Sequence, residues 1–347
     1  MELPAGRFVV PMAVGGALLV VAIAGLAYLL LRDDDVVARG DLIAYSCKEQ
    51  KNDWFAICVM RSDGTEKRRV TSQLATTDPA WSADGRRIAF TRNEDVGEFT
   101  TFTDDDVFVM DADGGDLEQL TPERDGSTSG QPAWSPDGRE IVFVRGPSVA
   151  SAVSAATATR FGSLLVMRPD GSVVRRLTRG EPDAAPAWSL DGREIAFVRG
   201  HDLNRQSGDA DLFVMDAAGG EPRRLTNTPA AFETAPAWSP DGSRIAFARG
   251  VDQSPYDGRA AIFLVNRDGT GERLVLEHRL YSYTSYGLSW SPDGRTLAFE
   301  TSPNRLCNAV ALVPVDGGPV RRLTSCKRPS QGALAPAWQP TETAEER

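Results

Sequence analysis

The residues best suited to molecular recognition gather in one short segment that contains His278, Arg279, Tyr281, Tyr283 and Tyr286. Tyrosine and arginine are enriched among the side chains that dominate binding energy at protein interfaces. Other connecting segments add further aromatic and arginine candidates: Phe99, Phe102, Arg160, Phe161, Phe232 and Tyr256. Together these residues predict a surface that binds a protein or a peptide. The alternative is that each aromatic side chain only packs its own loop onto the fold.

Groups that could perform catalysis are sparse. The chain has only 2 histidines, which lie in different loops, so they cannot form a histidine-rich metal site. The nearest match to the Gly-x-Ser-x-Gly nucleophile motif, at residues 126–130, has threonine at the nucleophile position. Calcium could bind residues 104–106, or Asp209 with Asp211, but acidic loop residues are usually solvated. We therefore predict no catalytic residue, no metal and no cofactor.

One phrase recurs along the chain and determines how these residues are positioned. It reads DPAWSADGRRIAF at its first occurrence and APAWQP at its last, and its tryptophans recur every 48 to 54 residues. These tryptophans are Trp81, Trp134, Trp188, Trp238, Trp290 and Trp338. Repeats of this length with several short strands are typical of β-propellers, solenoids or arrays. A buried indole covers about 150–250 Å², so we interpret the tryptophans as packing groups between blades rather than a row that stacks on a ligand.

Each repeat predicts four strands. Residues 79–81 form a first strand and residues 87–90 a second, and a Ser-Pro-Asp-Gly type turn joins them in most copies. An apolar third strand follows, as at residues 107–110, and its apolar positions indicate that both faces are covered. A glycine turn leads to an Arg-Arg-Leu-Thr type fourth strand, as at residues 175–178. We interpret the arginine pairs as charges that keep the outer edges soluble.

The two ends of the repeat array complete each other. Residues 42–45 read as a second strand with no first strand before it, and residues 336–338 read as a first strand with nothing after it. The sequence therefore predicts an all-β fold over residues 42–340. We expect a six-bladed β-propeller with four-stranded blades, in which a C-terminal strand joins the N-terminal blade and leaves no open sheet edge.

The combined phrase PAWSPDG, IAF, LFVMD, GG and RRLT resembles the propeller repeat of TolB, the periplasmic component of the bacterial Tol–Pal system. The resemblance covers about residues 41–340. It implies an envelope protein that binds other proteins. The same repeat occurs in prolyl oligopeptidase-like enzymes. In TolB an α/β domain precedes the propeller, and we expect residues 1–41 to hold a membrane anchor and linker in its place.

Residues 8–31 form a stretch of 24 residues without a charge. A helix of this length extends about 36 Å, enough to cross a hydrocarbon core of about 30 Å. We predict a short tail at residues 1–7, an uncleaved transmembrane signal anchor at 8–31, a linker at 32–41 and a C-terminal tail at 341–347. The alternative is a signal peptide cleaved after residues 22–24.

The 4 cysteines fall in two local pairs, Cys47 with Cys58 and Cys307 with Cys326. Pairs that the strand pattern brings together predict disulfides in an oxidising compartment; the alternative is four reduced thiols. The sequence therefore predicts a single-pass protein of the cytoplasmic membrane with its propeller on the extracytoplasmic side. The net charge of −10 argues against a nucleic-acid partner, which would need basic patches.

Strand direction sorts the connections into two faces. The face with the near-identical turns is called the uniform face. The face with the long, dissimilar connections is called the variable face. Recognition is usually built on such connections. Residue 42 enters from the uniform face, so a short linker would turn that face toward the membrane. We predict a membrane-anchored protein-binding or scaffold module of the cell envelope. The alternative is an envelope hydrolase, lyase or glycan-binding propeller that uses carboxylates at the channel mouth.

Overall fold

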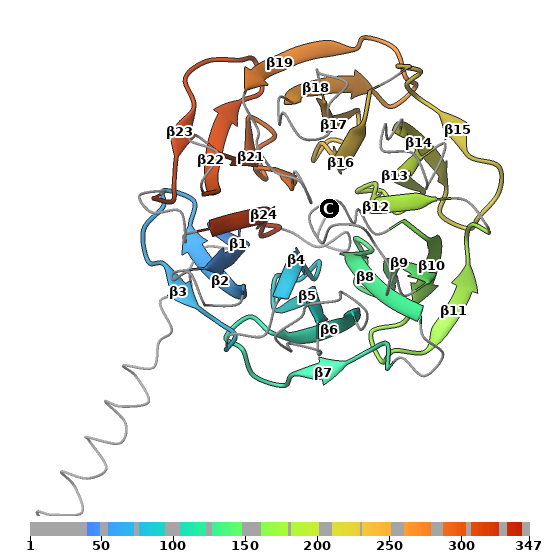
Figure 1. The fold of residues 1–347 in the computed structure, drawn as a ribbon, viewed down its shortest axis with the longest axis vertical. Coiled ribbons are helices and arrows are strands. Elements are labelled where there is room, and N and C mark those ends of the chain that lie inside the picture. Colours follow the sequence, from blue (N-terminus) through green and yellow to red (C-terminus); the bar gives the residue numbers. More distant parts are fainter. Residues whose placement is uncertain are drawn as a thin grey trace, which may run out of the picture. The chain divides into compact units, whose positions relative to one another are not determined.

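Six four-stranded antiparallel sheets are arranged as blades around a central axis (Figure 1). The computed structural model describes residues 40–48, 55–72, 76–93, 105–122, 127–147, 161–179, 182–200, 210–229, 231–250, 260–278, 287–302, 307–325 and 332–341. In each blade the first strand lies nearest the axis and the fourth lies at the outer rim. The predicted six-bladed propeller is thus confirmed for this part of the chain.

The strands follow the repeat. Blade 1 contains β24 (Gly332–Trp338), β1 (Leu42–Lys48), β2 (Ala56–Arg61) and β3 (Arg68–Arg69). Blade 2 contains β4 (Thr76–Trp81), β5 (Arg87–Asn93), β6 (Asp105–Asp111) and β7 (Glu118–Gln119). Blade 3 contains β8 (Ser127–Trp134), β9 (Ile141–Pro147), β10 (Ser163–Met167) and β11 (Val173–Arg176). Blade 4 contains β12 (Asp183–Trp188), β13 (Glu194–Gly200), β14 (Ala210–Asp216) and β15 (Arg223–Arg224). Blade 5 contains β16 (Glu233–Trp238), β17 (Arg244–Gly250), β18 (Ala260–Asn266) and β19 (Arg273–His278). Blade 6 contains β20 (Leu288–Trp290), β21 (Thr296–Thr301), β22 (Ala309–Pro314) and β23 (Arg321–Arg322).

The turn between the first and second strands is held by its own serine and aspartate. In blade 3 the Ser135 hydroxyl donates to Asp137 Oδ1 at 2.6 Å and accepts the Glu140 N–H at 2.9 Å. Gly138 has a φ of 68°, a conformation that favours glycine. The same serine–aspartate contact occurs in the turns that begin at Ser82, Ser189, Ser239 and Ser291. These polar side chains therefore stabilise the turns of the uniform face.

A bulge interrupts the first strand of most blades. The residue before the repeat's proline has a φ between 46° and 53° in five blades: Asp78, Gln131, Ala185, Ala235 and Ala335. The register of the strand pair shifts at each of these positions. Proline has no N–H to donate to the neighbouring strand, so the bulge falls where the hydrogen-bond ladder would be broken anyway. It turns one residue per blade toward the axis.

The core consists of apolar clusters between neighbouring blades. In one of them, Ala44, Ile57 and Val59 of blade 1 pack against Trp81 and Phe90 of blade 2. Four of the repeat tryptophans are 6–8% exposed: Trp81, Trp134, Trp238 and Trp290. The Nε1–H of Trp81 donates to the carbonyl of Ala337 in blade 1 at 3.1 Å. The tryptophans thus join adjacent blades, as expected from the sequence.

Blade 1 is built from both ends of the array. Strand β24 pairs antiparallel with β1, with Ile43 opposite Trp338 and Cys47 opposite Ala333. The indole of Trp338 donates to the carbonyl of Gly40 at 2.7 Å. Gln339 replaces the usual turn serine, and its amide donates to Gly85 of blade 2 at 3.0 Å. The predicted closure of the ring by a C-terminal strand is confirmed.

The arginine pairs do more than solubilise the rim. The first arginine of each pair reaches the turn of the next blade: Arg68 donates to the Ala112 carbonyl, Arg175 to Ala217, Arg223 to Arg267 and Arg321 to Asp63. Arg273 of blade 5 approaches Asp316 of blade 6 at 3.5 Å. Our interpretation of these arginines as merely solubilising was therefore incomplete, because the hydrogen bonds join neighbouring blades.

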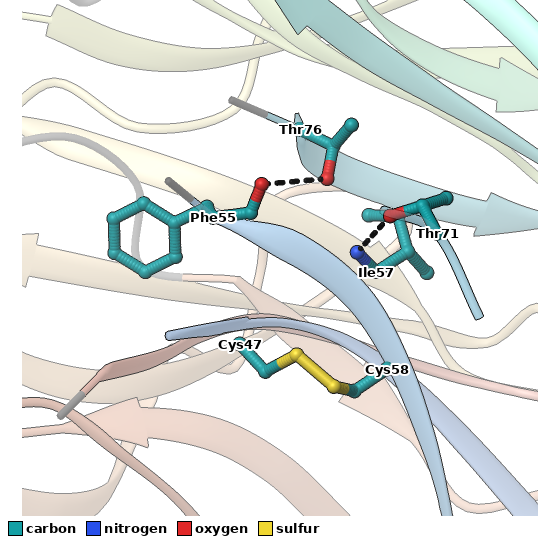
Figure 2. Close-up of a disulfide and its surroundings, with 6 residues drawn as sticks. All are labelled: Cys47, Phe55, Ile57, Cys58, Thr71 and Thr76. Atoms are coloured by element: carbon teal, nitrogen blue, oxygen red, sulfur yellow. Dashed lines mark hydrogen bonds between the residues drawn. A yellow bond between two sulfur atoms is a disulfide. The ribbon is translucent and has the colours of Figure 1, made fainter. Parts of the chain in front are cut away.

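One predicted disulfide is present in blade 1. Cys47 in β1 and Cys58 in β2 are bonded, with their Cα atoms 5.8 Å apart (Figure 2). Close by, the Ile57 N–H donates to the Thr71 hydroxyl at 2.9 Å. Cys307 is also disulfide-bonded, and its predicted partner, Cys326, lies outside the described residues.

The predicted membrane segment, residues 8–31, lies outside the described residues as well. Within the described ranges, no helix is long and apolar enough to cross a membrane.

Deleting residues 335–347 should open blade 1, because it removes most of β24 and the Trp338–Gly40 hydrogen bond. We expect a clearly lower melting temperature and stronger binding of a dye that reports exposed apolar surface. Deleting residues 342–347 alone is the matched control and should melt like the full chain. Equal melting of the two truncated proteins would contradict this closure.

Replacing Cys47 and Cys58 together by alanine should lower the free energy of unfolding by about 3 kcal/mol, because the unfolded chain loses a covalent constraint. Denaturant unfolding under non-reducing conditions measures this difference. Under reducing conditions the variant and the parent protein should unfold alike. Protein from its native compartment should show free thiols only after reduction.

Candidate binding faces and the central channel

The two faces expected from strand direction are present. Adjacent strands are antiparallel in every blade, so the first turn and the third turn of each blade lie on the uniform face. The ends of the second and fourth strands, and the starts of the third strands and of the next blade's first strand, lie on the variable face. Gly40 precedes β1 on the uniform face, where its N–H donates to Gln339 Oε1 at 3.2 Å.

Two of the predicted recognition residues are described in full, Phe161 and Phe232, and the structure brings them together. Both residues are half-buried, and their rings meet edge to face with centroids 6.3 Å apart. His278 ends β19 on the variable face. The other predicted residues lie outside the described ranges: Phe99, Phe102, Arg160, Tyr256, Arg279, Tyr281, Tyr283 and Tyr286. For these residues the prediction stands untested.

Phe161 and Phe232 come from connections on either side of blade 4. Phe161 lies over Gly200, because a Cβ built on that glycine would stand 3.6 Å from the ring. The carbonyl of Phe232 accepts the Gly250 N–H at 2.9 Å. Both phenylalanines are therefore fixed to strand ends, and their rings form one aromatic pair on the variable face. This packing agrees with the structural alternative, and both residues are only half-buried.

Buried ion pairs support the backbone next to this aromatic pair. Glu233, adjacent to Phe232, is fully buried and accepts the Nε–H of Arg249 at 2.8 Å. Arg249 also donates to both carboxylate oxygens of Glu272 at 2.7 Å. Burial raises the pKa of Glu233, although the Thr226 hydroxyl and the charge of Arg249 act in the opposite direction. This pairing and hydrogen bonding stabilise the connection that carries Phe232.

A second buried pair lies in blade 4. Arg199 donates through Nε and Nη2 to the two carboxylate oxygens of buried Asp183, at 2.6 and 3.0 Å. The guanidinium also lies over the ring of Phe213, 5.3 Å from its centroid. Sequence reasoning missed these pairs. The signal was the arginine two residues after the second-strand phenylalanine, which recurs in blades 2 to 5.

The acidic residues considered for calcium have other roles where they are described. Asp106 accepts hydrogen bonds from Gln119 and Thr121, at 2.6 and 3.0 Å. Asp211 accepts from Arg224 and from the Thr228 N–H. Within the described ranges no group of three or more potential metal ligands occurs. Asp104 and Asp209 lie outside those ranges.

The first strands surround a cavity of about 410 Å³ on the axis. Its wall combines the bulge residues, the repeat tryptophans and the prolines of the uniform-face turns, with contributions from all six blades. Asp78 is the sole charged side chain among the described residues of this wall. Two carboxylates placed for acid–base catalysis are thus not found in this lining.

The carboxylates of the uniform-face turns are strongly hydrogen-bonded. Partial burial acts to raise the pKa of Asp191, but hydrogen bonds from Ser189, Arg267 and the Arg193 amide together lower it to about 2. Arg267 reaches Asp191 at 2.8 Å from the adjacent blade. The ion pair therefore links blades 4 and 5 on this face.

Fold and channel define the class of this protein as a six-bladed β-propeller closed by a shared blade. Residues 180–341 match the family model described as "TolB beta propeller domain". This part of the chain is therefore similar to TolB propeller domains.

Known proteins of several kinds share this repeat. The "Tol-Pal system protein TolB" of Anaeromyxobacter dehalogenans is 30% identical over 215 residues, 59% of this chain and 42% of the relative. An "Uncharacterized peptidase YuxL" of Bacillus subtilis is 28% identical over 127 residues, 36% of this chain and 17% of the relative. The solved TolB of Acinetobacter baumannii aligns with a TM-score of 0.64 and 21% identity, over 92% of this chain and 71% of that one. This chain thus spans less than half the length of the TolB relative from Anaeromyxobacter.

Low pH should weaken the ion pair between Asp191 and Arg267. The pKa of Asp191 is lower in the folded state than the ordinary 3.8, so its contribution to stability is complete above about pH 4. It is lost as the pH falls toward 2. Asp191→Asn should therefore cost up to about 1 kcal/mol at neutral pH and nothing near pH 2, as measured by urea unfolding at several pH values.

The matched control is Asp137→Asn in the equivalent turn of blade 3, because no ion pair to Asp137 occurs within the described residues. An Asp191→Asn effect that is independent of pH would contradict the assignment.

Proposed function

We propose that this chain is an extracytoplasmic propeller of a bacterial cell envelope that is anchored in the membrane by residues 8–31. Its role is to bind a protein or peptide partner through the variable face. The proposal is supported by the resemblance to proteins named for the Tol-Pal system. Disulfide-bonded Cys47, Cys58 and Cys307 agree with an oxidising compartment.

The observation that carries the proposal is the Phe161–Phe232 pair. Two half-buried phenylalanines from separate connections meet edge to face on the variable face, and buried ion pairs hold the backbone beside them. Aromatic side chains on a rigid support lose little entropy on binding. The tyrosine-rich connection, with Tyr281, Tyr283 and Tyr286, leaves the same face after β19 and would extend this surface.

A binding role also fits the chemistry of the two faces better than a catalytic role. The serine and aspartate side chains of the uniform face bond to their own turns, which leaves them little capacity to recognise a partner. The described channel wall has a single carboxylate, Asp78. We therefore favour binding by the variable face over hydrolysis or elimination at the channel mouth.

Replacing Phe161 and Phe232 together by alanine should weaken partner binding by about 2 kcal/mol or more, roughly thirtyfold, if the pair is a hot spot. The partner is first identified by crosslinking the full chain in envelopes of its own host, and its affinity for purified protein is then measured by titration. The Tyr281/Tyr283/Tyr286 triple-alanine variant should show a comparable loss.

The control is Arg193→Ala with Arg295→Ala, two exposed changes on the uniform face. It should leave affinity unchanged. Full binding by both folded aromatic variants, with loss in the arginine control, would overturn the assignment of the variable face.

A further inference from the structure

The outer strand of blade 2 differs in charge from the other outer strands. Arginine stands in β3, β11, β15, β19 and β23, whereas β7 contains Glu118 and Gln119. Glu118 occupies the position from which Arg68 and Arg175 donate to the next blade. A carboxylate has no hydrogen to donate to a carbonyl, so the glutamate removes a link between blades. The packing of the ring therefore does not account for this change.

Two more exposed residues stand beside Glu118. Asp116 precedes it by two positions, and Leu117, which is 45% exposed, precedes it by one. Neither Asp116 nor Glu118 forms an ion pair with any residue that the structure describes. Residues 116–118 are called the acidic rim segment. This segment presents an exposed leucine between two carboxylates.

The neighbouring outer edge, in blade 3, has the complementary composition. Val173 begins β11 and is 52% exposed, and the exposed Arg168 and Arg176 stand on either side of it in the chain. Neither arginine pairs with a carboxylate within the described ranges. Asp170, in the same turn, accepts two hydrogen bonds from Ser172, at 2.9 and 2.6 Å. Arg168, Val173 and Arg176 are called the basic rim segment.

The two segments lie beside each other on the outer rim, where Figure 1 shows β7 and β11 as neighbours. The third turn of blade 3 touches the chain just after β7, because a Cβ built on Gly171 would stand 2.8 Å from the Leu120 carbonyl oxygen. Both segments adjoin the third turn of their blade, so they lie at the same height, close to the uniform face. Leu117 and Val173 are two of the three large hydrophobic residues that are exposed in the described part of the chain. Exposed apolar groups with a polar rim are typical of interaction sites.

A second copy of the chain fits this surface. A two-fold axis parallel to the propeller axis brings the blade 2 rim of each copy against the blade 3 rim of the other. Leu117 then meets Val173 of the second copy, and Glu118 faces its Arg176, twice in the dimer. A two-fold axis along the rim would instead bring the two acidic rim segments together, where like charges repel. Charge complementarity thus selects the first arrangement.

We propose that the outer rim of blades 2 and 3 is an interface through which two copies of this chain associate side by side. The opposite charges set which blades meet, and the leucine and valine form the apolar centre of the contact. Both uniform faces then point the same way, and so do both variable faces. The interface lies on the outer rim, away from the aromatic pair, and it does not depend on the function proposed above.

Sedimentation of the full chain in mild detergent, over a range of protein concentrations, measures the affinity of the dimer. Glu118→Arg and Arg176→Glu should each weaken it by about tenfold or more, because each change turns two attractions into repulsions. The double variant Glu118→Arg/Arg176→Glu restores opposite charges across the interface and should dimerise like the parent chain. Glu277→Arg, the same charge change at an exposed position of blade 5, is the matched control and should have no effect.

A parent chain that stays monomeric at every concentration would overturn the proposal. So would a double variant that dimerises no better than the two single variants, or a control that weakens the dimer as much as they do.

Crosslinking tests the arrangement of the two copies. A mixture of the Leu117→Cys and Val173→Cys chains, treated with a short bis-maleimide, should give a crosslinked pair that contains one chain of each kind. Either variant alone should crosslink much less, because each residue meets the other kind across the two-fold axis. Efficient crosslinking of Leu117→Cys with itself would show that the acidic rim segments meet and would refute the arrangement.

Discussion

The structure depends on the pairing of β24 with β1. Six sheets packed around an axis need a covalent or hydrogen-bonded connection between first and last blade, or one blade edge remains open. Here the two ends of the array contribute strands to the same sheet. Gln339 and the Trp338 indole add bonds from this sheet to the next blade and to the entering chain. All other blades are positioned within a ring that this pairing closes.

The repeat gives the two faces of the propeller different kinds of residues. Serine, aspartate and glycine satisfy the hydrogen bonds of the uniform-face turns within each turn. The threonine after each Arg-Arg-Leu segment accepts a hydrogen bond from a third-strand N–H, as Thr226 does from Leu212. Blade 5 lacks this threonine, and its outer strand β19 is six residues long, whereas most outer strands have two. Its backbone continues the ladder to His278, which pairs with Ala260 at the variable-face end of β19. Departures from the repeat thus mark the blades whose residues have a role other than packing.

Much of the architecture could be predicted because it follows from local chemistry repeated many times. Proline-alanine-tryptophan, the Asp-Gly turns and the apolar third strands each specify a strand or a turn, and their order gave blade count and closure. The Cys47–Cys58 bond followed from strand order in the same way. The bulge at Asp78 and the Arg199–Asp183 pair could not be predicted, because they depend on the register of the first and second strands within one blade. The arginines that join blades could not be predicted, because they depend on which side chains meet across separate blades. The Phe161–Phe232 contact has the same origin: these residues are 71 positions apart in the sequence and meet only after blade 4 has been placed between them.

The contact at Gly40 indicates that the propeller can be circularly permuted. A Cβ on Gly40 would lie 2.2 Å from Thr341 Cγ2, so the first and last described residues of the propeller touch. Proteins whose ends are adjacent can be circularly permuted when the new ends fall in exposed connections. Joining residues 40 and 341 through a short linker and opening any variable-face connection would give a ring with the same six blades. Which blade combines strands from both ends of the chain would then depend only on where the chain starts, and any of the six blades could be that blade.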